Sequence, residues 1–243
     1  VAFAFLLYQF HRLKEIMVRT NHKLFGHRFL MDLVVPGGVT VDVDAAQAST
    51  ILDEMDALAR EFERLVLIYD ENSSLEDRVR DTGVLLPDKA RDLGVVGIVA
   101  RASGLNLDCR VDHSFTPYDS LCVNVPVLVS GDAHARAWVR VEEIRESMRL
   151  IKEILAGLPS GRMMIPIDNP LPDRSGFAAV EGWRGEILSW VQSGPDGGIN
   201  RCMVRDPSSV NWLALEQCIH GNIVPDFPLC NKSFNQSYSG HDL

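Results

Sequence analysis

Hydrophobic side chains recur every three or four positions along three long stretches of the chain, the spacing that places them on one face of an α-helix. These stretches cover about residues 1–25, 45–69 and 133–156. Asp44 and Asp132 stand directly before the second and third stretches, where a carboxylate can accept hydrogen bonds from the first free N–H groups of a helix. Gly157 favours a helix end after the third stretch. The pattern therefore predicts three long helices.

The last of these helices has a narrow hydrophobic stripe, which we interpret as the core of a helical bundle. Its members are Val141, Ile144, Met148, Ile151 and Leu155. Shorter elements are expected between the long helices. They are a short strand at residues 39–43, a helix at 87–94 that starts with a proline, and a strand-like segment at 121–129.

Past residue 175 hydrophobic and polar positions alternate, and this period of two favours β-strands. We predict strands at about residues 177–181, 186–192 and 200–204. The glycine- and proline-rich segment 194–198 is expected to form the turn between the last two. Asp206 and Pro207 then start a helix that reaches about residue 220.

Together these elements predict a mainly α (α+β) protein, a long helical bundle with a small antiparallel β-subdomain. We expect a single domain over residues 1–243, with the bundle in 1–170, the β-subdomain in 176–205 and a C-terminal helical segment in 206–243. The apolar run at the start is too short to span a bilayer and lacks the features of a signal peptide. Because it resembles a helix already under way, we expect the chain to be a fragment without its N-terminal part.

Composition narrows the class of function. The 243 residues are 46% hydrophobic, which is enough to bury a sizeable core. The net charge of -9 argues against nucleic-acid binding, because phosphate contacts require a basic surface. Five scattered cysteines form no C-x-x-C pair, so we expect a reducing compartment, no disulfide framework, and a small buried hydrophobic side chain at each cysteine.

Three groups of short motifs follow one another along the chain. The first is GHR at residues 26–28 with VPGGV at 35–39. The second is DCR at 108–110, PYD at 117–119, VPV at 125–127, GD at 131–132 and RVEEIRES at 140–147. The third is EGWRGE at 181–186 with RCMVRDPS at 201–208. In order and spacing they resemble the catalytic-subunit family shared by NADH-quinone oxidoreductase, where it is the D subunit, and membrane-bound [NiFe]-hydrogenases, in its hydrogenase-4/formate hydrogenlyase-like branch.

The resemblance implies a long helical bundle with a small β-subdomain, in agreement with the hydrophobic pattern. It also implies an oxidoreductase subunit that is active only within a complex. The chain is then expected to lie against a small iron–sulfur subunit in a peripheral arm that docks on membrane subunits at the cytoplasmic side. We expect the iron–sulfur cluster to belong to that partner, no cofactor to be bound by this fragment itself, and quinone to be one candidate acceptor.

Hydrogenase relatives hold nickel with two C-x-x-C pairs, because thiolates suit a soft transition metal. The segment that matches the C-terminal pair is NQSYSG at residues 235–240, where Ser237 and Gly240 occupy the two cysteine positions. The other pair would precede Val1. A substitute site from Cys230, His241 and Asp242 is a weaker alternative. We therefore expect that no hydrogenase-type nickel centre forms.

Arg184 matches the arginine that lies above the metal in hydrogenases, and we expect it to act catalytically with Glu181 as its partner. An arginine stays charged and donates in a rigid fork, so it can stabilise developing negative charge. Trp183 replaces the usual proline, which puts the turn geometry in question. The alternative is an ion pair that braces the β-subdomain.

Other charged residues of the motifs are further candidates. His27 and Arg28 are expected near the partner's iron–sulfur cluster, as the resemblance implies. We expect a larger set of residues to form a charge relay or a subunit contact. This set is Asp108, Arg110, Tyr118, Asp119, Arg140, Glu142, Glu143 and Arg145. For Arg140, Glu142, Glu143 and Arg145 the alternative is a solvated helix surface.

Three functions remain open at this point. The first is a component similar to the D subunit, which passes electrons from an iron–sulfur subunit to quinone or another acceptor without a nickel–iron centre. The second is a true [NiFe]-hydrogenase large subunit, which Ser237 and Gly240 disfavour. The third is a scaffold that keeps the fold and docks subunits without catalysis.

Overall fold

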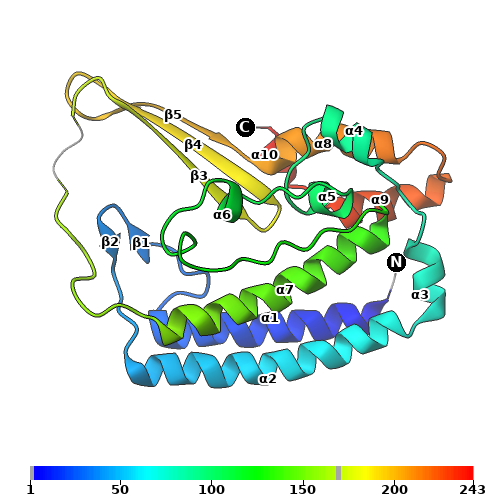
Figure 1. The fold of residues 1–243 in the computed structure, drawn as a ribbon, viewed down its shortest axis with the longest axis horizontal. Helices are drawn as coiled ribbons and strands as arrows, with labels where there is room; N and C mark the ends of the chain where they lie inside the picture. Colours follow the sequence, from blue (N-terminus) through cyan, green and yellow to red (C-terminus); the bar gives the residue numbers. More distant parts are fainter. Residues whose placement is uncertain (1–2, 168–170, 243) are drawn as a thin grey trace. The chain divides into compact units, whose positions relative to one another are not determined.

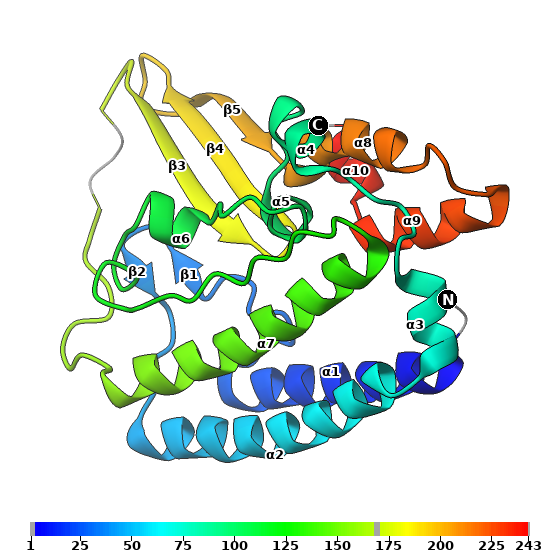
Figure 2. The same ribbon diagram turned by 45° about the vertical axis from the view of Figure 1, so that its right-hand side comes forward.

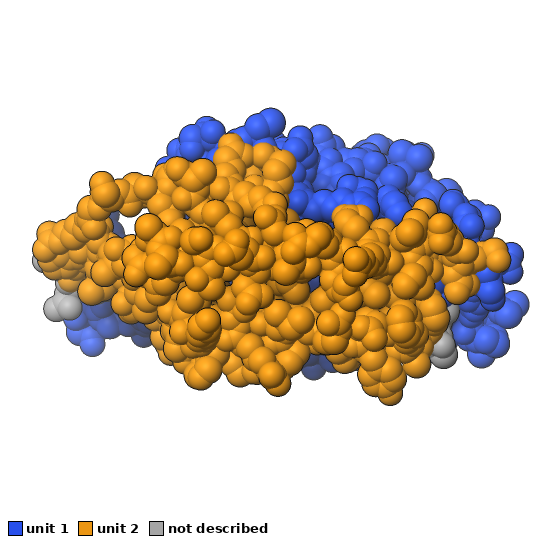
Figure 3. All heavy atoms as spheres, turned by 90° about the horizontal axis from the view of Figure 1, so that it is seen from below, with its two compact units in different colours: residues 1, 74–146, 170–243 blue, residues 2–73, 147–169 orange. Residues whose placement is uncertain are grey.

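A computed structural model describes residues 3–167 and 171–242. The chain divides into two compact units, coloured separately in Figure 3. Unit 1 comprises residues 1, 74–146 and 170–243, and unit 2 comprises residues 2–73 and 147–169. The elements show the expected α+β class, with long helices and one three-stranded antiparallel sheet. The domain boundaries predicted from the sequence stay a prediction.

Unit 2 is built on two long helices, α1 (Ala4–Phe25) and α2 (Ala45–Asp70), which lie side by side in Figure 1. The Phe10 and Phe62 rings meet edge to face with their centroids 6.0 Å apart. Asp44 caps α2 as predicted: its carboxylate accepts the N–H of Gln47, whose side chain accepts the N–H of Asp44. This capping box satisfies two backbone donors at once.

A small hairpin of β1 (Val34–Val35) and β2 (Gly38–Val39) follows α1. The predicted strand at 39–43 is wrong, because pairing stops at Val39. Pro36 and Gly37 form the turn, and a Cβ on Gly38, the first residue of β2, would overlap the carbonyl oxygen of Met163. Gly38 bridges to Met164, and Val39 donates its N–H to the carbonyl of Met163. The β1–β2 ladder does not continue beyond Val39.

Unit 1 contains the sheet, in the order β3 (Ser175–Gly182), β4 (Gly185–Ser193) and β5 (Ile199–Arg205). Figures 1 and 2 show the three strands side by side, and all three strand predictions are confirmed. The helices of this unit are α3 (Ser73–Val79, all but its first residue), α4 (Pro87–Asp92), α5 (Gly97–Ala102), α6 (Cys109–Asp112), α8 (Pro207–Cys218), η1 (Val224–Asp226), α9 (Phe227–Phe234) and α10 (Tyr238–His241).

The core of unit 1 joins α4, α5, α8 and α9, with buried side chains that include Val95, Val99, Leu215, Cys218 and Phe234. Cys109 is also buried, so the prediction of buried cysteines is confirmed for Cys109, Cys218 and Cys230. It is wrong for Cys122 and Cys202, which are exposed on a loop and on β5. No helix among the described residues is both long and apolar enough to cross a membrane.

Helix α7 (Ala133–Ala156) begins in unit 1 and ends in unit 2. Its predicted core stripe is only partly right, because Ile144 is 39% exposed. The fully buried hydrophobic positions are Ala135 and Val139, where small side chains permit close packing. The strand-like segment 121–129 is extended but unpaired, since its backbone N–H groups bond elsewhere, as Asn124 does to Glu146 and Leu128 to the carbonyl of Arg101.

Candidate functional site

Arg101 on α5 is the centre of a buried ionic network in unit 1. It is 1% exposed and donates from Nη1 to Glu181 Oε1 at 3.0 Å. The same nitrogen lies 3.3 Å from Asp108 Oδ2 and 2.9 Å from the carbonyl of Leu107. Glu143 Oε1 lies 3.0 Å from Arg101 Nη2 without hydrogen-bond geometry, so that contact is ionic only.

Arg110 closes the network from α6. Its Nη2 lies 2.6 Å from Asp108 Oδ2 and 3.1 Å from Glu143 Oε2. Asp108 also caps α6, because its Oδ1 accepts the backbone N–H of Arg110. The structure thus brings together four predicted residues, Asp108, Arg110, Glu143 and Glu181, which come from three separate motifs. Two guanidinium groups face three carboxylates there.

Burial and pairing with arginine shift the pKa values of Asp108 and Glu181 in opposite directions. Burial alone would raise the pKa of Asp108, but the hydrogen bond and charge of Arg110, together with Arg101, hold that pKa below its ordinary value. For Glu181 burial wins and raises the pKa, although Arg101 and the N–H of Cys109 oppose it. The hydrogen bond to Asp108 raises the pKa of Arg110. Of these two carboxyls, Glu181 therefore takes up a proton more readily than Asp108.

The predicted pairing of Glu181 with Arg184 is wrong. Glu181 lies in β3 opposite Glu186, whereas Arg184 lies in the tight turn between the paired residues Gly182 and Gly185. Glu181 bonds Arg101 and the N–H of Cys109, while Arg184 donates its Nε to the carbonyl of Asn235 at 2.6 Å. The guanidinium of Arg184 lies 4.2 Å from the centroid of the Trp183 ring.

Arg184 belongs to a second arginine site, the arginine cluster, formed with Arg136 and Arg140 of α7. Arg136 is fully buried and donates to the carbonyls of Gly83 and Gly131 and to the hydroxyl of Ser233. Arg140 donates to the carbonyls of Arg136 and Phe234. Burial lowers the pKa of both Arg136 and Arg140 to about 10, and the charges of Arg136 and Arg184 add to the effect on Arg140.

The remaining candidates of the relay set lie apart from both sites. Glu142 and Arg145 pair with each other at 2.7 Å on α7. Tyr118 packs against the Phe115 ring, and Asp119 accepts a hydrogen bond from Thr116 on an exposed loop.

In unit 2, His27 and Arg28 follow directly after α1. His27 Nδ1 accepts the backbone N–H groups of Phe29 and Met31. Arg28 forms a two-pronged ion pair with Glu15, at 3.2 and 2.7 Å. Each of the two side chains therefore has a local partner within this unit.

At the former cysteine positions, Ser237 and Gly240 form a small capped turn. The Ser237 hydroxyl accepts the N–H of Gly240, and the Ser237 N–H donates to Ser208. A Cβ on Gly240 would lie 2.6 Å from the Asp206 carboxyl carbon, so a second thiolate has no room there. Cys230 is fully buried and His241 stacks on Trp212. The residues at this end of the chain do not fit a nickel centre held by thiolates.

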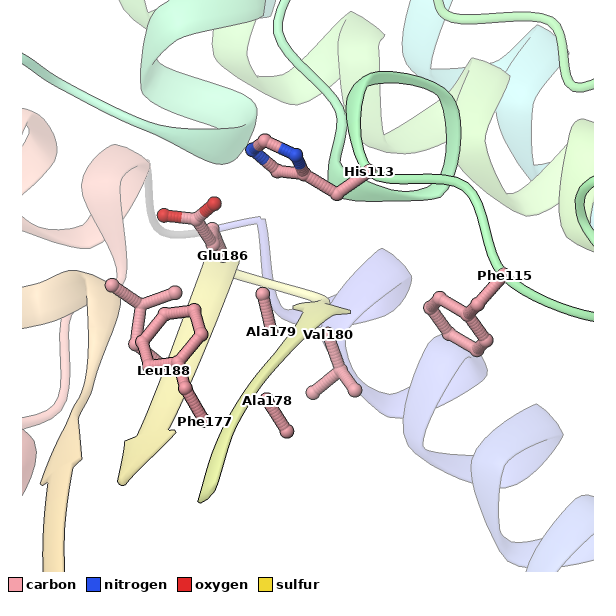
Figure 4. A pocket seen from close by; sticks show the side chains of 8 residues that line it. All are labelled: His113, Phe115, Phe177, Ala178, Ala179, Val180, Glu186 and Leu188. Atoms are coloured by element: carbon pink, nitrogen blue, oxygen red, sulfur yellow. The ribbon is translucent and has the colours of Figure 1, made fainter. Parts of the chain in front are cut away.

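A shallow apolar groove of about 740 Å³ lies beside the first two strands of the sheet. Figure 4 shows its lining, with the His113 ring on the same side as the Glu186 carboxylate. Glu186 is already paired with Arg205 at 2.6 Å. The apolar part of the lining is Phe115, Phe177, Ala178, Ala179, Val180 and Leu188.

Two central arginines, Arg101 and Arg136, are absent from the residues that the sequence motifs single out. Arg101 is a lone cation in the apolar run VVGIVARA at residues 95–102, and a charge inside such a run is itself a signal of a buried partner. Arg136 gives no comparable signal, since its partners are two backbone carbonyls and the hydroxyl of Ser233, which lies 97 residues away on α9.

Comparisons with known proteins give one consistent picture. The profile of the family described as respiratory-chain NADH dehydrogenase, 49 Kd subunit, matches residues 2–175. The carbon monoxide-induced hydrogenase of Rhodospirillum rubrum is 30% identical over 227 residues, which are 93% of this chain and 63% of the relative. Formate hydrogenlyase subunit 5 of Escherichia coli is 31% identical over 237 residues, 96% of this chain and 41% of the relative.

The D subunit of NADH-quinone oxidoreductase from Paramagnetospirillum magneticum is 28% identical over 91% of this chain and 63% of its own length. Among solved structures, a chain of the membrane-bound sulfane sulfur reductase, an archaeal respiratory membrane complex, superposes with a TM-score of 0.88 at 26% identity. The match covers 96% of this chain and 65% of that one. The chain thus spans less than two thirds of the length of each of these proteins.

Proposed function

The chain belongs to the family of the 49 Kd subunit of respiratory-chain NADH dehydrogenase, and from this premise we propose that it is a subunit of a membrane-associated, ion-translocating oxidoreductase complex. In this proposal the chain takes electrons from an adjacent iron–sulfur subunit and passes them to quinone or another acceptor. It does so without a nickel–iron centre, and only within the complex. The complex docks on membrane subunits, with this chain at the cytoplasmic side.

The observation that supports this proposal most directly is the buried network around Arg101. Charged groups are costly to bury, and a fold retains them only when they are paired. Here the network holds one more carboxylate than guanidinium groups, and burial raises the pKa of Glu181. Such a network can bind a proton when the charge near it changes, which is the property that coupling of electron transfer to ion movement requires.

An exposed apolar surface of unit 2 supports a docked partner. The loop after α1 and the segment beyond residue 162 lie together, since Ile165 donates its N–H to the carbonyl of Gly37 at 3.0 Å. Large hydrophobic side chains are exposed on both, with Val34 82% exposed. The others include Phe29, Leu30, Met31, Met163, Met164, Ile165 and Ile167. Apolar surfaces of this kind are typical of subunit interfaces.

His27 and Arg28 belong to the same loop, next to Phe29. We assign this surface to the small iron–sulfur subunit, beside which the charge of Arg28 is offset by its ion pair with Glu15. The absence of a nickel–iron centre is supported by the close approach of Asp206 to Gly240 and by the Ser237 cap.

The test is electron transfer through the purified full-length complex, measured from the reduced iron–sulfur subunit to a water-soluble quinone. We expect Arg184→Ala to slow transfer at least tenfold, because the variant removes a fixed positive charge beside the path. Arg201→Gln, an exposed change on β5, serves as the matched control and should leave transfer unchanged.

Two outcomes favour the alternatives. If Arg184→Ala transfers electrons at the wild-type rate in a complex of unaltered composition, the chain is a scaffold. If the wild-type complex contains stoichiometric nickel and evolves hydrogen, it is a hydrogenase large subunit. Metal analysis and a hydrogen electrode on the same preparation separate these cases.

A further inference from the structure

The arginine cluster gathers around the C-terminal end of α9. Arg140 Nη2 donates to the carbonyl of Phe234 at 3.1 Å, and Arg184 Nε donates to the next carbonyl, that of Asn235, at 2.6 Å. Arg136 lies 4.5 Å from the centroid of the Phe234 ring. Asn235 ends the helix in the left-handed conformation, with φ 55°. Two guanidinium groups thus converge on consecutive carbonyls of one helix end.

The positive charge of the cluster is only partly offset within the described part of the chain, where the charge of Asp132 acts on Arg136. No carboxylate there forms an ion pair with Arg136, Arg140 or Arg184. The helix end contributes only about half a negative charge. Burial lowers the pKa of Arg136 and Arg140 to about 10, so both remain protonated at neutral pH. Three protonated guanidinium groups therefore share one region, and none of them forms an ion pair with a described residue.

Arg184 has donors left over. Its Nε is used by Asn235, whereas Nη1 and Nη2 have no hydrogen-bond acceptor among the described residues. Its side chain is only partly buried, and the Trp183 ring lies against the guanidinium. A planar guanidinium fork presents two parallel N–H groups at the spacing of the two oxygens of a carboxylate.

We propose that the arginine cluster is a binding site for a small carboxylate. Arg184 holds the two oxygens through its terminal nitrogens, while Arg140 and Arg136 supply the surrounding positive field. The proposal concerns binding alone, so it is measured without electron transfer and can fail independently of the proposed function.

The probes are acetate and oxalate, each added to the full-length protein in place of chloride at constant ionic strength. A ligand that binds the folded state raises the unfolding temperature in a saturable manner. We expect saturable rises with both probes, and tighter binding of oxalate because it has two negative charges. Isothermal calorimetry should give one site per chain.

The deciding variant is Arg184→Gln. Residue 184 lies at the tip of the turn between β3 and β4, and circular dichroism checks that the variant folds. We expect its affinity for oxalate to be at least tenfold weaker. Arg201→Gln removes an arginine from the same unit and should bind as the wild type does. The proposal is overturned if neither probe gives a saturable rise, or if Arg184→Gln and the wild type respond alike.

Discussion

Unit 1 contains two sites, centred on Arg101 and Arg136, in which a buried guanidinium is stabilised by different kinds of partner. Arg101 is surrounded by carboxylates, and the network has a surplus of negative charge. Arg136 forms no ion pair with a described residue and is held by the carbonyls of Gly83 and Gly131 and by Ser233, with the charge of Asp132 as a weaker contribution. The first site neutralises its cation with ion pairs, and the second mainly with the dipoles of carbonyl and hydroxyl groups.

The difference determines how each site responds to change. Ionised partners can gain or lose protons, so the Arg101 network is sensitive to pH and to charges that arrive nearby. Backbone carbonyls cannot titrate, so the arginine cluster keeps its charge at neutral pH. One site is suited to proton uptake and the other to holding an anion, and the predictions below test that contrast.

Removal of the central cation should have the largest effect. Arg101→Met leaves three buried carboxylates against one guanidinium, and the loss of one partner of a buried ionic network costs about 3–5 kcal/mol. We expect the free energy of unfolding in urea to fall by this amount. Arg91→Met, on an exposed pair with Asp88, is the control and should change it by less than about 1 kcal/mol. Equal effects of the two variants would contradict a buried network.

Arg136→Lys should cost somewhat less. A lysine keeps the charge, but its single ammonium cannot reach two carbonyls and a hydroxyl at once, so buried acceptors lose their donors. Each buried acceptor without a donor costs about 1–3 kcal/mol. We expect the free energy of unfolding to fall by about 2–3 kcal/mol in total. Denaturant unfolding measures it, and a lysine variant as stable as the wild type would show that charge alone holds the site.

Glu143→Gln should be the mildest of the three substitutions. It reduces the network to two carboxylates and two guanidinium groups, so the surplus charge disappears while most of the packing remains. We expect a change of about 1 kcal/mol or less in unfolding free energy. A loss as large as that of Arg101→Met would mean that Glu143 is needed for more than charge balance.

The pH dependence of stability separates two carboxyls of the network. The folded state raises the pKa of Glu181, so its ionisation costs stability as pH rises from the unfolded value through the raised value. The stability of Glu181→Gln relative to the wild type should therefore increase as pH rises over that range. The pKa of Asp108 is lowered, so its contribution is present above about pH 4 and is lost as pH falls further. Asp108→Asn should show the reverse trend in the same unfolding titration.

Local features of the fold could be predicted, and long-range ones could not. Asp44 is identifiable as a helix cap because its partner Gln47 is three residues away. The pairing of Glu181 escapes prediction because its true partner, Arg101, is eighty residues away in the chain. The segment 121–129 has the composition of a strand, but Pro126 cannot donate to a ladder, Asn124 bonds the Glu146 side chain and Leu128 bonds the last turn of α5.

The candidate site shows the same limit. Family motifs identify Asp108, Arg110, Glu143 and Glu181, and these do meet. The motifs could not show that Arg140 would join Arg184, away from its helix neighbour Glu143, because helix spacing alone places the two on one face.

Two glycines lie back to back where α5 meets the tip of the hairpin between β3 and β4. A Cβ on Gly97, at the start of α5, would overlap the carbonyl oxygen of Arg184, and one on Gly185 would stand 3.0 Å from Gly97. With no side chain between them to absorb a shift, a tilt of α5 must displace the hairpin tip. Because Arg101 lies four residues further along α5, we expect any shift of this helix on protonation of the carboxylates around Arg101 to move the Arg184 guanidinium as well.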